Sequence, residues 1–225
     1  ASGCRPPRAS GASRRGRGRR VNGAGSMHLP QSGAAERAPE GDAQLAPALS
    51  VRAARSEDVP LIFENIGYWA SQGRMLVRPM QNIFENLRDF FVAEIDEGDG
   101  PRFAGNGALH ILWGDIAEVR GLAVAPNVRA RGVGRALVAA CEEEARRVGI
   151  PTLFAWTYEV AFFERCGFTL IDKSRDLHPR VWSECLRCPF YVGCNENGMV
   201  KRMDGVPMPA NLPEPPPAQV PPGIR

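Results

Sequence analysis

The pattern of hydrophobic and polar residues divides the chain into a folded middle and two tails. Residues 1–48 are rich in Gly, Ala, Ser, Pro and Arg and show no apolar periodicity. Ordering such a segment costs conformational entropy that no burial offsets. From Val206 onward the chain is rich in proline, which does not pack as helix or sheet. The pattern therefore predicts a disordered tail over residues 1–48, one folded domain over 49–203 and a disordered tail over 204–225.

Within residues 49–203, the spacing of apolar positions predicts both strands and helices. Short or alternating apolar runs are typical of strands, and apolar residues at helical spacing are typical of amphipathic helices. Strands are expected over 49–54, 92–95, 103–113, 116–124, 152–156, 168–171 and 199–202. Helices are expected from 56 to a stop at Gly73, over 82–90, from 133 to a stop at Gly149, and over 159–166. This order indicates a mixed α/β fold.

Composition narrows the class of protein. The chain has 225 residues, of which 44% are hydrophobic, enough for a real core. No apolar run approaches the roughly 18 residues of a membrane helix, and no apolar segment follows the basic first 20 residues as it would in a secretion signal. We therefore expect a soluble, cytoplasmic protein without a membrane partner. The net charge of +3 depends on arginines in residues 1–20, so nucleic acid is an expected partner only through that basic tail.

A loop rich in arginine and glycine lies between the strand at 116–124 and the long helix that follows it. Its residues 129–134 read R-x-x-G-x-G. The two glycines, Gly132 and Gly134, allow a ligand to approach the backbone closely. The free amides and dipole of the following helix favour an anion, and nearby guanidinium groups add fixed positive charge from Arg129, Arg131 and Arg135. The loop therefore predicts a pyrophosphate site, and its spacing is that of neither the P-loop nor the dinucleotide fingerprint.

A cluster of three cysteines follows later in the chain, at Cys185, Cys188 and Cys194. In a chain without a secretion signal, such a cluster suggests metal or redox chemistry rather than disulfides. With His178 the three thiolates would complete a tetrahedral zinc site. Free thiols or a local disulfide are the alternatives. A further histidine, His110, stands alone in a predicted strand and is interpreted as a packed core residue.

Two motifs together resemble the GNAT (GCN5-related) N-acetyltransferase superfamily. The first is the strand followed by R-x-x-G-x-G and a helix, and the second is residues 162–168, FFERCGF, which are similar to the F-[YF]-x-x-x-G-F of the family. Within the superfamily, three segments resemble the short N-acetylglutamate synthases that lack a kinase-like domain: GRMLVR at 73–78, GALHILW at 107–113 leading into AEVR at 117–120, and 157–168. The resemblance covers most of residues 49–203. It implies a GNAT fold, with a mixed central sheet of about six to seven strands flanked by about four helices.

The resemblance also implies where acetyl-CoA would bind. Its pyrophosphate would lie on the loop and first helical turn, formed by Arg129, Ala130, Arg131, Gly132, Val133, Gly134 and Arg135. Its pantetheine arm would pair with the strand edge at Leu122, Ala123 and Val124. A bulge in that strand would direct one amide at the thioester carbonyl and stabilise the developing oxyanion.

Three side chains are candidates for the chemistry and for the acceptor. Glu118 occupies the strand position of the base in histone-type relatives, and its alternative is a salt bridge to a neighbour. Arg78 and Arg120 are expected to bind substrate carboxylates, because guanidinium groups pair with them bidentately; surface solvation or structural pairing is the alternative. The family's tyrosine acid is replaced by Phe163, and Tyr158 is the nearest phenol in sequence.

The function expected from the resemblance is acetyl-CoA-dependent acetylation of the α-amino group of an amino acid, L-glutamate, in arginine biosynthesis. Two alternatives stay open. One is a GNAT enzyme that acetylates another small-molecule amine or a protein N-terminus, and the other is a non-catalytic module that binds CoA. The sequence leaves the oligomeric state open, a homodimer included.

Overall fold

A computed structural model describes residues 48–128, 131–173, 175–186, 188 and 193–216. Arg129 and Ala130 of the predicted pyrophosphate loop lie outside these residues, as does almost all of the predicted N-terminal tail. No helix within the described ranges is long and apolar enough to cross a membrane.

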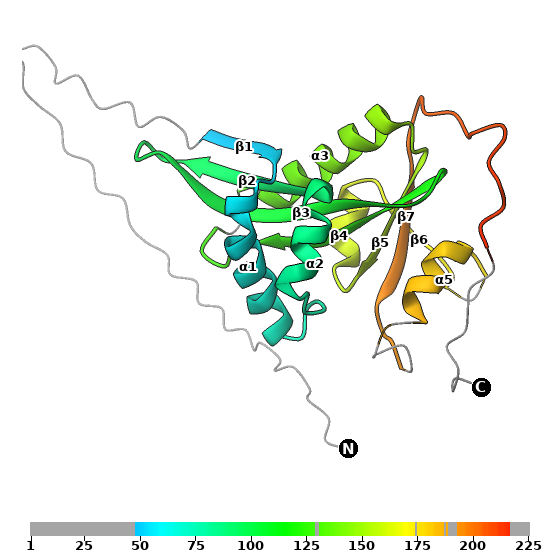
Figure 1. Cartoon of the computed structure of the whole chain (residues 1–225), viewed down its shortest axis with the longest axis horizontal. Coiled ribbons are helices and arrows are strands. Elements are labelled where there is room, and N and C mark those ends of the chain that lie inside the picture. The colour runs from blue at the N-terminus through cyan, green and yellow to red at the C-terminus, as the bar shows by residue number, and fades with distance from the viewer. Residues whose placement is uncertain (1–47, 129–130, 174, 187, 189–192, 217–225) are drawn as a thin grey trace, which may run out of the picture. The chain divides into compact units, whose positions relative to one another are not determined.

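The centre of the domain is one mixed sheet of seven strands in the order β1-β2-β3-β4-β5-β7-β6 (Figure 1). The strands are β1 (Ala48–Ala53), β2 (Phe90–Asp96), β3 (Pro101–Trp113), β4 (Ile116–Val124), β5 (Thr152–Thr157), β6 (Thr169–Leu170) and β7 (Asn197–Arg202). Every neighbouring pair is antiparallel except β4 and β5, which are parallel. The parallel pair needs a crossover connection, which the longest helix provides.

Helices cover both faces of this sheet. They are α1 (Val59–Ser71), α2 (Met80–Glu85), α3 (Val133–Val148), α4 (Val160–Arg165) and α5 (Pro179–Cys185), with single 3-10 turns at Ser56–Asp58 and Leu87–Asp89. Ala108 of β3 is buried against α1 and α2, whereas its neighbour Leu109 is buried in the cluster that contains α3 and α4. Successive strand residues point to opposite faces, so this alternation places α1 and α2 on one face and α3 on the other (Figure 1).

The mixed α/β fold and its central sheet are confirmed, and two local predictions are wrong. The helix predicted over 82–90 ends at Glu85, and Phe90 begins β2. Phe90 continues the helical spacing of Ile83 and Leu87 by coincidence, while its side chain packs from the sheet into the same core cluster. The second is an omission, because helix α5 over Pro179–Cys185 was not predicted.

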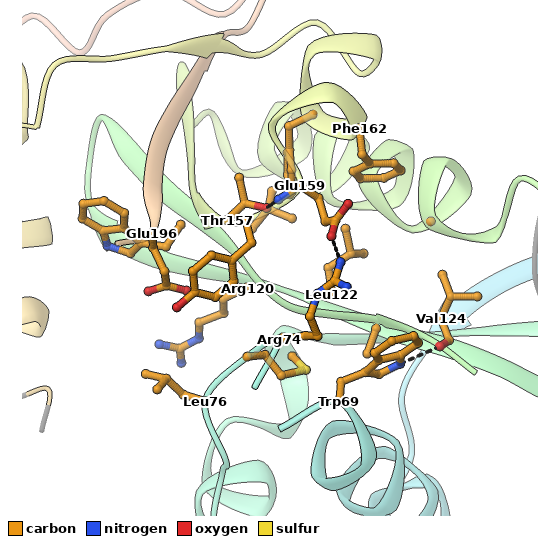
Figure 2. Close-up of a pocket in the computed structure, with 18 of the residues that line it drawn as sticks. Trp69, Arg74, Leu76, Arg120, Leu122, Val124, Thr157, Glu159, Phe162 and Glu196 are labelled. Carbon is orange, nitrogen blue, oxygen red and sulfur yellow. Dashed lines mark hydrogen bonds and ion pairs between the residues drawn. The ribbon is translucent and has the colours of Figure 1, made fainter. Parts of the chain in front are cut away.

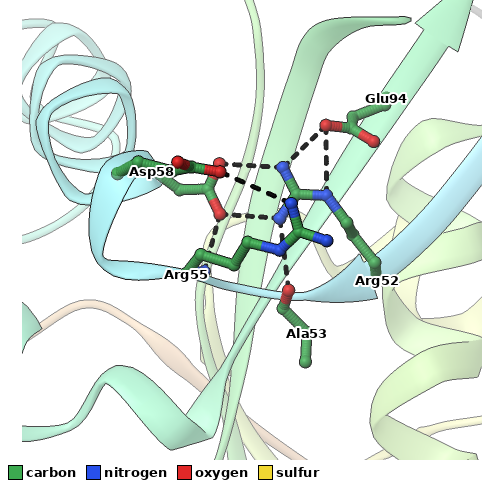
Figure 3. A network of polar contacts seen from close by, with 6 residues as sticks. Arg52, Ala53, Arg55, Asp58 and Glu94 are labelled. Atoms are coloured by element: carbon green, nitrogen blue, oxygen red, sulfur yellow. Dashed lines mark hydrogen bonds and ion pairs between the residues drawn. The ribbon is translucent and has the colours of Figure 1, made fainter.

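A polar network fixes the start of the domain to the sheet (Figure 3). Arg52 of β1 donates to Asp58 Oδ2 at 2.7 Å and to Glu94 Oε1 of β2 at 2.7 Å. Asp58 also accepts from the Arg55 backbone amide at 2.7 Å. The hydrogen bond from Arg52 is the main reason that the pKa of Asp58 lies below its ordinary value, and burial opposes this effect. The network therefore sets where α1 begins, and α1 in turn lines the site described below.

Strands β4 and β5 separate beyond Glu118, and this separation creates the site. Their register runs only from Ile116–Thr152 to Glu118–Phe154, although β4 continues to Val124 and β5 to Thr157. The backbone edge of β4 beyond Glu118 is therefore not covered by a neighbouring strand, and a cleft opens between the two strand ends.

Candidate active site

The cleft holds a cavity of about 450 Å³. Figure 2 shows Arg120 and Glu196 at one end of it and Val124 with Trp69 at the other. Its walls come from the α1–α2 connection, β4, β5 and α4, and they include Trp69, Arg74, Leu76, Arg78, Glu118, Arg120, Leu122, Val124, Gly134, Trp156, Tyr158, Glu159, Phe162, Arg165 and Glu196. Residues that are far apart in the sequence therefore meet in one cavity beside the open edge of β4.

A bulge in β4 gives this edge its shape, as the sequence predicted. Asn106 of β3 pairs with Ala123 and Ala108 pairs with Arg120, so two residues of β4 oppose one residue of β3. Gly121 within the bulge has φ +58°, a conformation that costs other residues strain. The bulge changes the direction of the backbone amides at the point where β4 leaves β5.

Two buried asparagines hold the bulge in place. Asn65 of α1 donates to Asn106 Oδ1 at 2.8 Å and to the carbonyl oxygen of Ala123 at 3.0 Å. Asn106 in turn donates to the carbonyl oxygen of Gly121 at 2.7 Å. Both asparagines are at most 6% exposed, and these bonds satisfy both side-chain NH2 groups and Asn106 Oδ1, whereas Asn65 Oδ1 has no partner among the described residues. Sequence reasoning missed this pair because its members are 41 residues apart.

Beyond the bulge, Val124 directs its backbone groups into the cleft. Ala125 donates its amide to Ala104 of β3 at 2.8 Å, and alternate residues of an antiparallel strand face opposite sides. Val124 therefore faces away from β3, and its carbonyl oxygen accepts from Trp69 Nε1 at 2.8 Å (Figure 2). Of the three predicted pantetheine contacts, Leu122 and Val124 are half-buried beside the cavity, while Ala123 is 4% exposed.

The N-terminus of α3 opens onto a second cavity of about 370 Å³, which shares Val124, Gly134, Phe162 and Arg165 with the first. Gly132 precedes the helix with φ +77°, and as a glycine it has no side chain that could cap the first amides of the helix. A Cβ at Gly134 would lie 3.1 Å from the Phe162 ring, so the helix start and α4 pack closely at this position. The first turn therefore presents free N–H groups to an open groove, which suits an anion.

The predicted residues around this helix end are placed differently from one another. Val133 is 2% exposed, so its side chain belongs to the core and its amide alone faces the groove end of the helix. Arg131 forms an ion pair with Glu97, and this pairing lowers the pKa of Glu97. Arg135 donates to the carbonyl oxygen of Arg165 at 3.0 Å.

Glu118, Arg120 and Arg78, the three predicted catalytic and substrate-binding residues, all line the first cavity. The Arg120 side chain is only 9% exposed, and its Nη2 lies 3.5 Å from Asn86 Oδ1 and 3.8 Å from Asp89 Oδ2. Arg78 donates to Asn82 Oδ1 at 3.2 Å. These contacts orient both guanidinium groups, and Glu118 lines the same cavity.

Several residues of the cavity were not found from the sequence. Arg74 and Glu159 form an ion pair that bridges the α1–α2 and β5–α4 connections across the cleft (Figure 2). Burial raises the pKa of the Glu196 carboxyl. Burial, followed by the charge of Glu196, raises the pKa of Tyr158, which keeps this phenol protonated. The sequence named Tyr158 only as the nearest phenol to the missing tyrosine. No local pattern indicates Arg74, Glu159 or Glu196, because only the fold brings them to the same cleft.

The zinc site predicted at Cys185, Cys188 and Cys194 is not supported. Within the described part of the chain, no three His, Cys, Asp or Glu side chains come together as possible metal ligands. His178 instead lies 3.5 Å from Asp115 Oδ1, and the three cysteines are free thiols. Burial raises the pKa of Cys185 to about 12.

The interpretation of His110 as a packed core residue is also wrong. Its side chain is 27% exposed and its Nδ1 lies 2.7 Å from Asp89 Oδ2. His110 pairs with Glu118 across the β3–β4 ladder.

A sheet opened between two parallel strands, a strand bulge at the opening and an uncapped helix N-terminus beside it together define the GNAT class of acyltransferase. The family model "Acetyltransferase (GNAT) family" matches residues 60–168. An uncharacterised N-acetyltransferase of Chlorobaculum tepidum is 35% identical over 68% of this chain and 96% of its own length. An amino-acid acetyltransferase of Mycobacterium tuberculosis is 37% identical over 54% of this chain and 69% of its own length. The chain therefore belongs to the GNAT acetyltransferase family and is an acyltransferase.

Two solved structures share the architecture. A Mycobacterium tuberculosis protein in complex with CoA and NLQ has a TM-score of 0.60 and 31% identity, and the match covers 68% of this chain and 98% of that one. The N-acetylglutamate synthase of Neisseria gonorrhoeae, in complex with coenzyme A and N-acetyl-glutamate, has a TM-score of 0.60 and 28% identity. That match covers 69% of this chain and 35% of the synthase.

Proposed function

We propose that this protein transfers the acetyl group of acetyl-CoA to the α-amino group of L-glutamate. The observation that carries the proposal is the meeting of one carboxylate, Glu118, with two guanidinium groups, Arg78 and Arg120, in a cavity that adjoins the free N-terminus of α3. Relatives named amino-acid acetyltransferase and the structural match to N-acetylglutamate synthase support this acceptor class. The reaction would place the protein in arginine biosynthesis.

The groove offers acetyl-CoA two kinds of contact. The uncapped amides at the start of α3 suit its pyrophosphate, because they combine free donors with the positive end of the helix dipole. The open edge of β4 at Leu122 and Val124 suits the amides of its pantetheine arm, which would pair as a neighbouring strand does. The thioester would then lie near the bulge, toward Glu118.

In the proposed reaction, Glu118 accepts a proton from the acceptor's ammonium group, directly or through one water. The free amine attacks the thioester carbonyl, and an amide of the bulged strand stabilises the oxyanion that forms. The C–S bond breaks and CoA leaves as a thiolate. Phe163 has no hydroxyl to protonate it, whereas Tyr158 lines the same cavity and its raised pKa keeps it protonated.

The acceptor is recognised through its two carboxylates. Arg120 is nearly buried and held by Asn86 and Asp89, so its guanidinium is fixed before substrate arrives. Arg78 comes from the opposite wall of the cavity, next to α2. Two guanidinium groups from two elements can each bind one carboxylate bidentately. An acceptor with a single carboxylate would occupy only one of them.

A direct test measures CoA release with each of the twenty amino acids at a fixed acetyl-CoA concentration. We expect the highest kcat/KM with glutamate and a value about 100-fold lower with glutamine, which has the same shape but lacks the second charge. A preference for a basic or uncharged amino acid would overturn the proposal. Such a result would assign Glu159 and Glu196 of the cavity to acceptor binding instead.

The two arginines can be tested separately. Replacing Arg78 or Arg120 by glutamine removes one charge-assisted contact, so each variant should raise the KM for glutamate about 10- to 100-fold and leave the KM for acetyl-CoA within about twofold. Arg146→Gln is the matched control, because Arg146 lies on the exposed face of α3 and pairs with Glu142 at 3.5 Å. An unchanged KM for glutamate in Arg78→Gln would remove Arg78 from the site.

A further inference from the structure

His110 and Asp89 form a pair next to Glu118, the proposed base, across the β3–β4 ladder. This pair has no part in the reaction described so far. His110 of β3 is the register partner of Glu118 of β4. Partners across an antiparallel ladder point to the same face, with Cβ atoms about 5 Å apart. Ala108 and Arg120 are also partners, two residues along each strand from His110 and Glu118. Residues two apart in a strand share a face, so Glu118, Arg120 and His110 occupy the same face of the sheet.

Asp89 determines which nitrogen of His110 is available. Asp89 Oδ2 lies 2.7 Å from His110 Nδ1, so a neutral imidazole donates its Nδ1 proton to the carboxylate and keeps a lone pair on Nε2. This is the arrangement in which a carboxylate orients an imidazole to accept a proton and stabilises the imidazolium that results.

His110 also has its own path to solvent. It lines a third cavity of about 510 Å³, together with Asp89, Arg88 and Ile111. The His110 and Asp89 side chains are 27% and 26% exposed, so neither is sealed in the core. Glu118 lines the acceptor cavity and not this one, so the ladder pair connects the two cavities.

The charges around His110 come from every element that packs on it. Asp89 belongs to the 3-10 turn before β2, and Glu118 and Arg120 belong to β4. Glu85 and Arg88 line the third cavity together with His110. Three of these groups are acidic and two are basic.

We propose that His110 and Asp89 form a proton exit for Glu118. The inference rests on the proposed function. Glu118 takes one proton from the acceptor ammonium, and the carboxylic acid then passes that proton to Nε2 of His110, directly or through one water. Glu118 returns to its carboxylate form. The imidazolium of His110, held by Asp89, then releases the proton to solvent in the third cavity. No oxidant or other reactant is required.

The physical reason for such an exit is the mismatch between an ammonium group and a carboxylate. An α-amino group has an ordinary pKa of about 8, a carboxyl group about 4.3 and an imidazole about 6.5. An imidazole is in general a stronger base than a carboxylate, so moving the proton on to it offsets part of the uphill transfer. During turnover the acceptor cavity is filled by substrates. A route from Glu118 across the β3–β4 pair to the third cavity would keep the base connected to water.

The test compares His110→Gln with His178→Gln. His178 is a matched control, because it too is paired with an aspartate, Asp115, at 3.5 Å, but it lines a different cavity. We expect His110→Gln to lower kcat about 10- to 100-fold at pH 7, with the KM for acetyl-CoA unchanged and the KM for glutamate within about threefold. The control should keep its full kcat.

Two further measurements separate proton transfer from a structural effect. Imidazole is a diffusible base, so His110→Ala should regain about a fifth or more of its lost kcat in about 50 to 100 mM imidazole. Glu118→Gln should not respond to imidazole. Raising the pH should recover part of the kcat lost in His110→Gln, because more of the acceptor is then already a free amine that has no proton to pass on.

The outcomes are distinct. An unchanged kcat and pH profile in His110→Gln, or a folded His110→Ala that imidazole does not rescue, would overturn the proton exit while leaving the acetyl transfer intact. If wild-type protein instead prefers another amine, the acceptor assignment fails, and the same variants measured with that amine still test the exit, because every ammonium acceptor must lose a proton.

Discussion

At the scale of single residues, strand alternation places the chemistry. Glu118 and Arg120 are two residues apart in β4, so both point to the face that α1 and α2 cover, while the alternate residues Ala117 and Val119 are buried against α3 and α4. The polar positions of this strand are therefore set by its pattern, and their partners are set by the fold. Arg120 contacts Asn86 and Asp89, which are about thirty residues earlier in the chain.

Glu118→Gln tests the proposed base with almost no change in shape. The amide cannot accept the acceptor's proton, so kcat should fall about 100- to 10,000-fold at pH 7, while the KM for acetyl-CoA changes little. Raising the pH should recover part of the rate, because more of the acceptor is then already a free amine. Stopped-flow or steady-state release of CoA measures both effects. A variant with more than half of the wild-type kcat would show that Glu118 is a structural residue.

Asp58→Asn tests the network at the start of the domain. The pKa of Asp58 is held below its ordinary value of 3.8, chiefly by Arg52, so the carboxylate stabilises the fold above that pH and this contribution is lost as the pH falls through the lowered value. We expect the variant to lose about 2 kcal/mol of unfolding free energy at pH 7. The difference from wild type should shrink as the pH falls below about 3.8.

Urea unfolding at several pH values measures this difference, with Asp99→Asn at an exposed position of the β2–β3 turn as the control. A penalty that stays constant from pH 7 to acid would contradict the role of the Asp58 charge.

At the scale of elements, helix α3 is bounded by two glycines in the same conformation. Gly132 before the helix and Gly149 after it both have φ +77°, and a Cβ at either position would meet open space. Both glycines were expected from the sequence, one from the loop motif and one from the helix stop. They differ only in what lies beside them, because Gly132 borders the groove and Gly149 does not.

These two glycines make a matched pair of variants. Gly132→Ala and Gly149→Ala should each lower the free energy of unfolding by about 1 kcal/mol, because alanine is strained at positive φ. Only Gly132→Ala should raise the KM for acetyl-CoA, by about tenfold, since the strain shifts the free amides of the first turn. Equal KM values in the two variants would remove the start of α3 from the coenzyme site.

At the scale of the whole molecule, the chain returns at its end to the β3–β4 turn. Residues 204–216 contain no helix or strand, yet Leu212 packs over Gly114, and Trp113 Nε1 donates to the carbonyl oxygen of Pro213 at 2.9 Å. The proline-rich composition predicted a disordered tail over residues 204–225, and these contacts join two residues of that segment to the domain.

Leu212→Ala should therefore lower the free energy of unfolding by about 1 kcal/mol, because it removes apolar surface that is partly buried over the turn. The kinetic constants should not change, since this turn lies away from the cleft. Thermal unfolding and acetyl transfer measured on the same sample check both statements, with Leu170→Ala, 57% exposed, as the control. A loss of activity at unchanged stability would show a link between this segment and the site.

The sequence by itself determined the elements that have long periodic patterns and the loop with its own local chemistry. Helix α3, its glycine boundaries, the three central strands and the positions of Glu118 and Arg120 all follow from interactions between residues close in the chain. Such signals are local, because the 3.6-residue and two-residue periods are properties of single elements.

The tertiary structure alone decided which distant residues share the cleft. It brought Asn65 and Asn106 together under the bulge, Arg74 to Glu159, and His110 to Asp89, and it did not bring the three cysteines together as metal ligands. It also ended α2 early, because Phe90 gains more by packing from the sheet than by extending a short helix. The physical reason is that burial and polar pairing depend on the whole packed core, while a sequence pattern records only the neighbours of each residue along the chain.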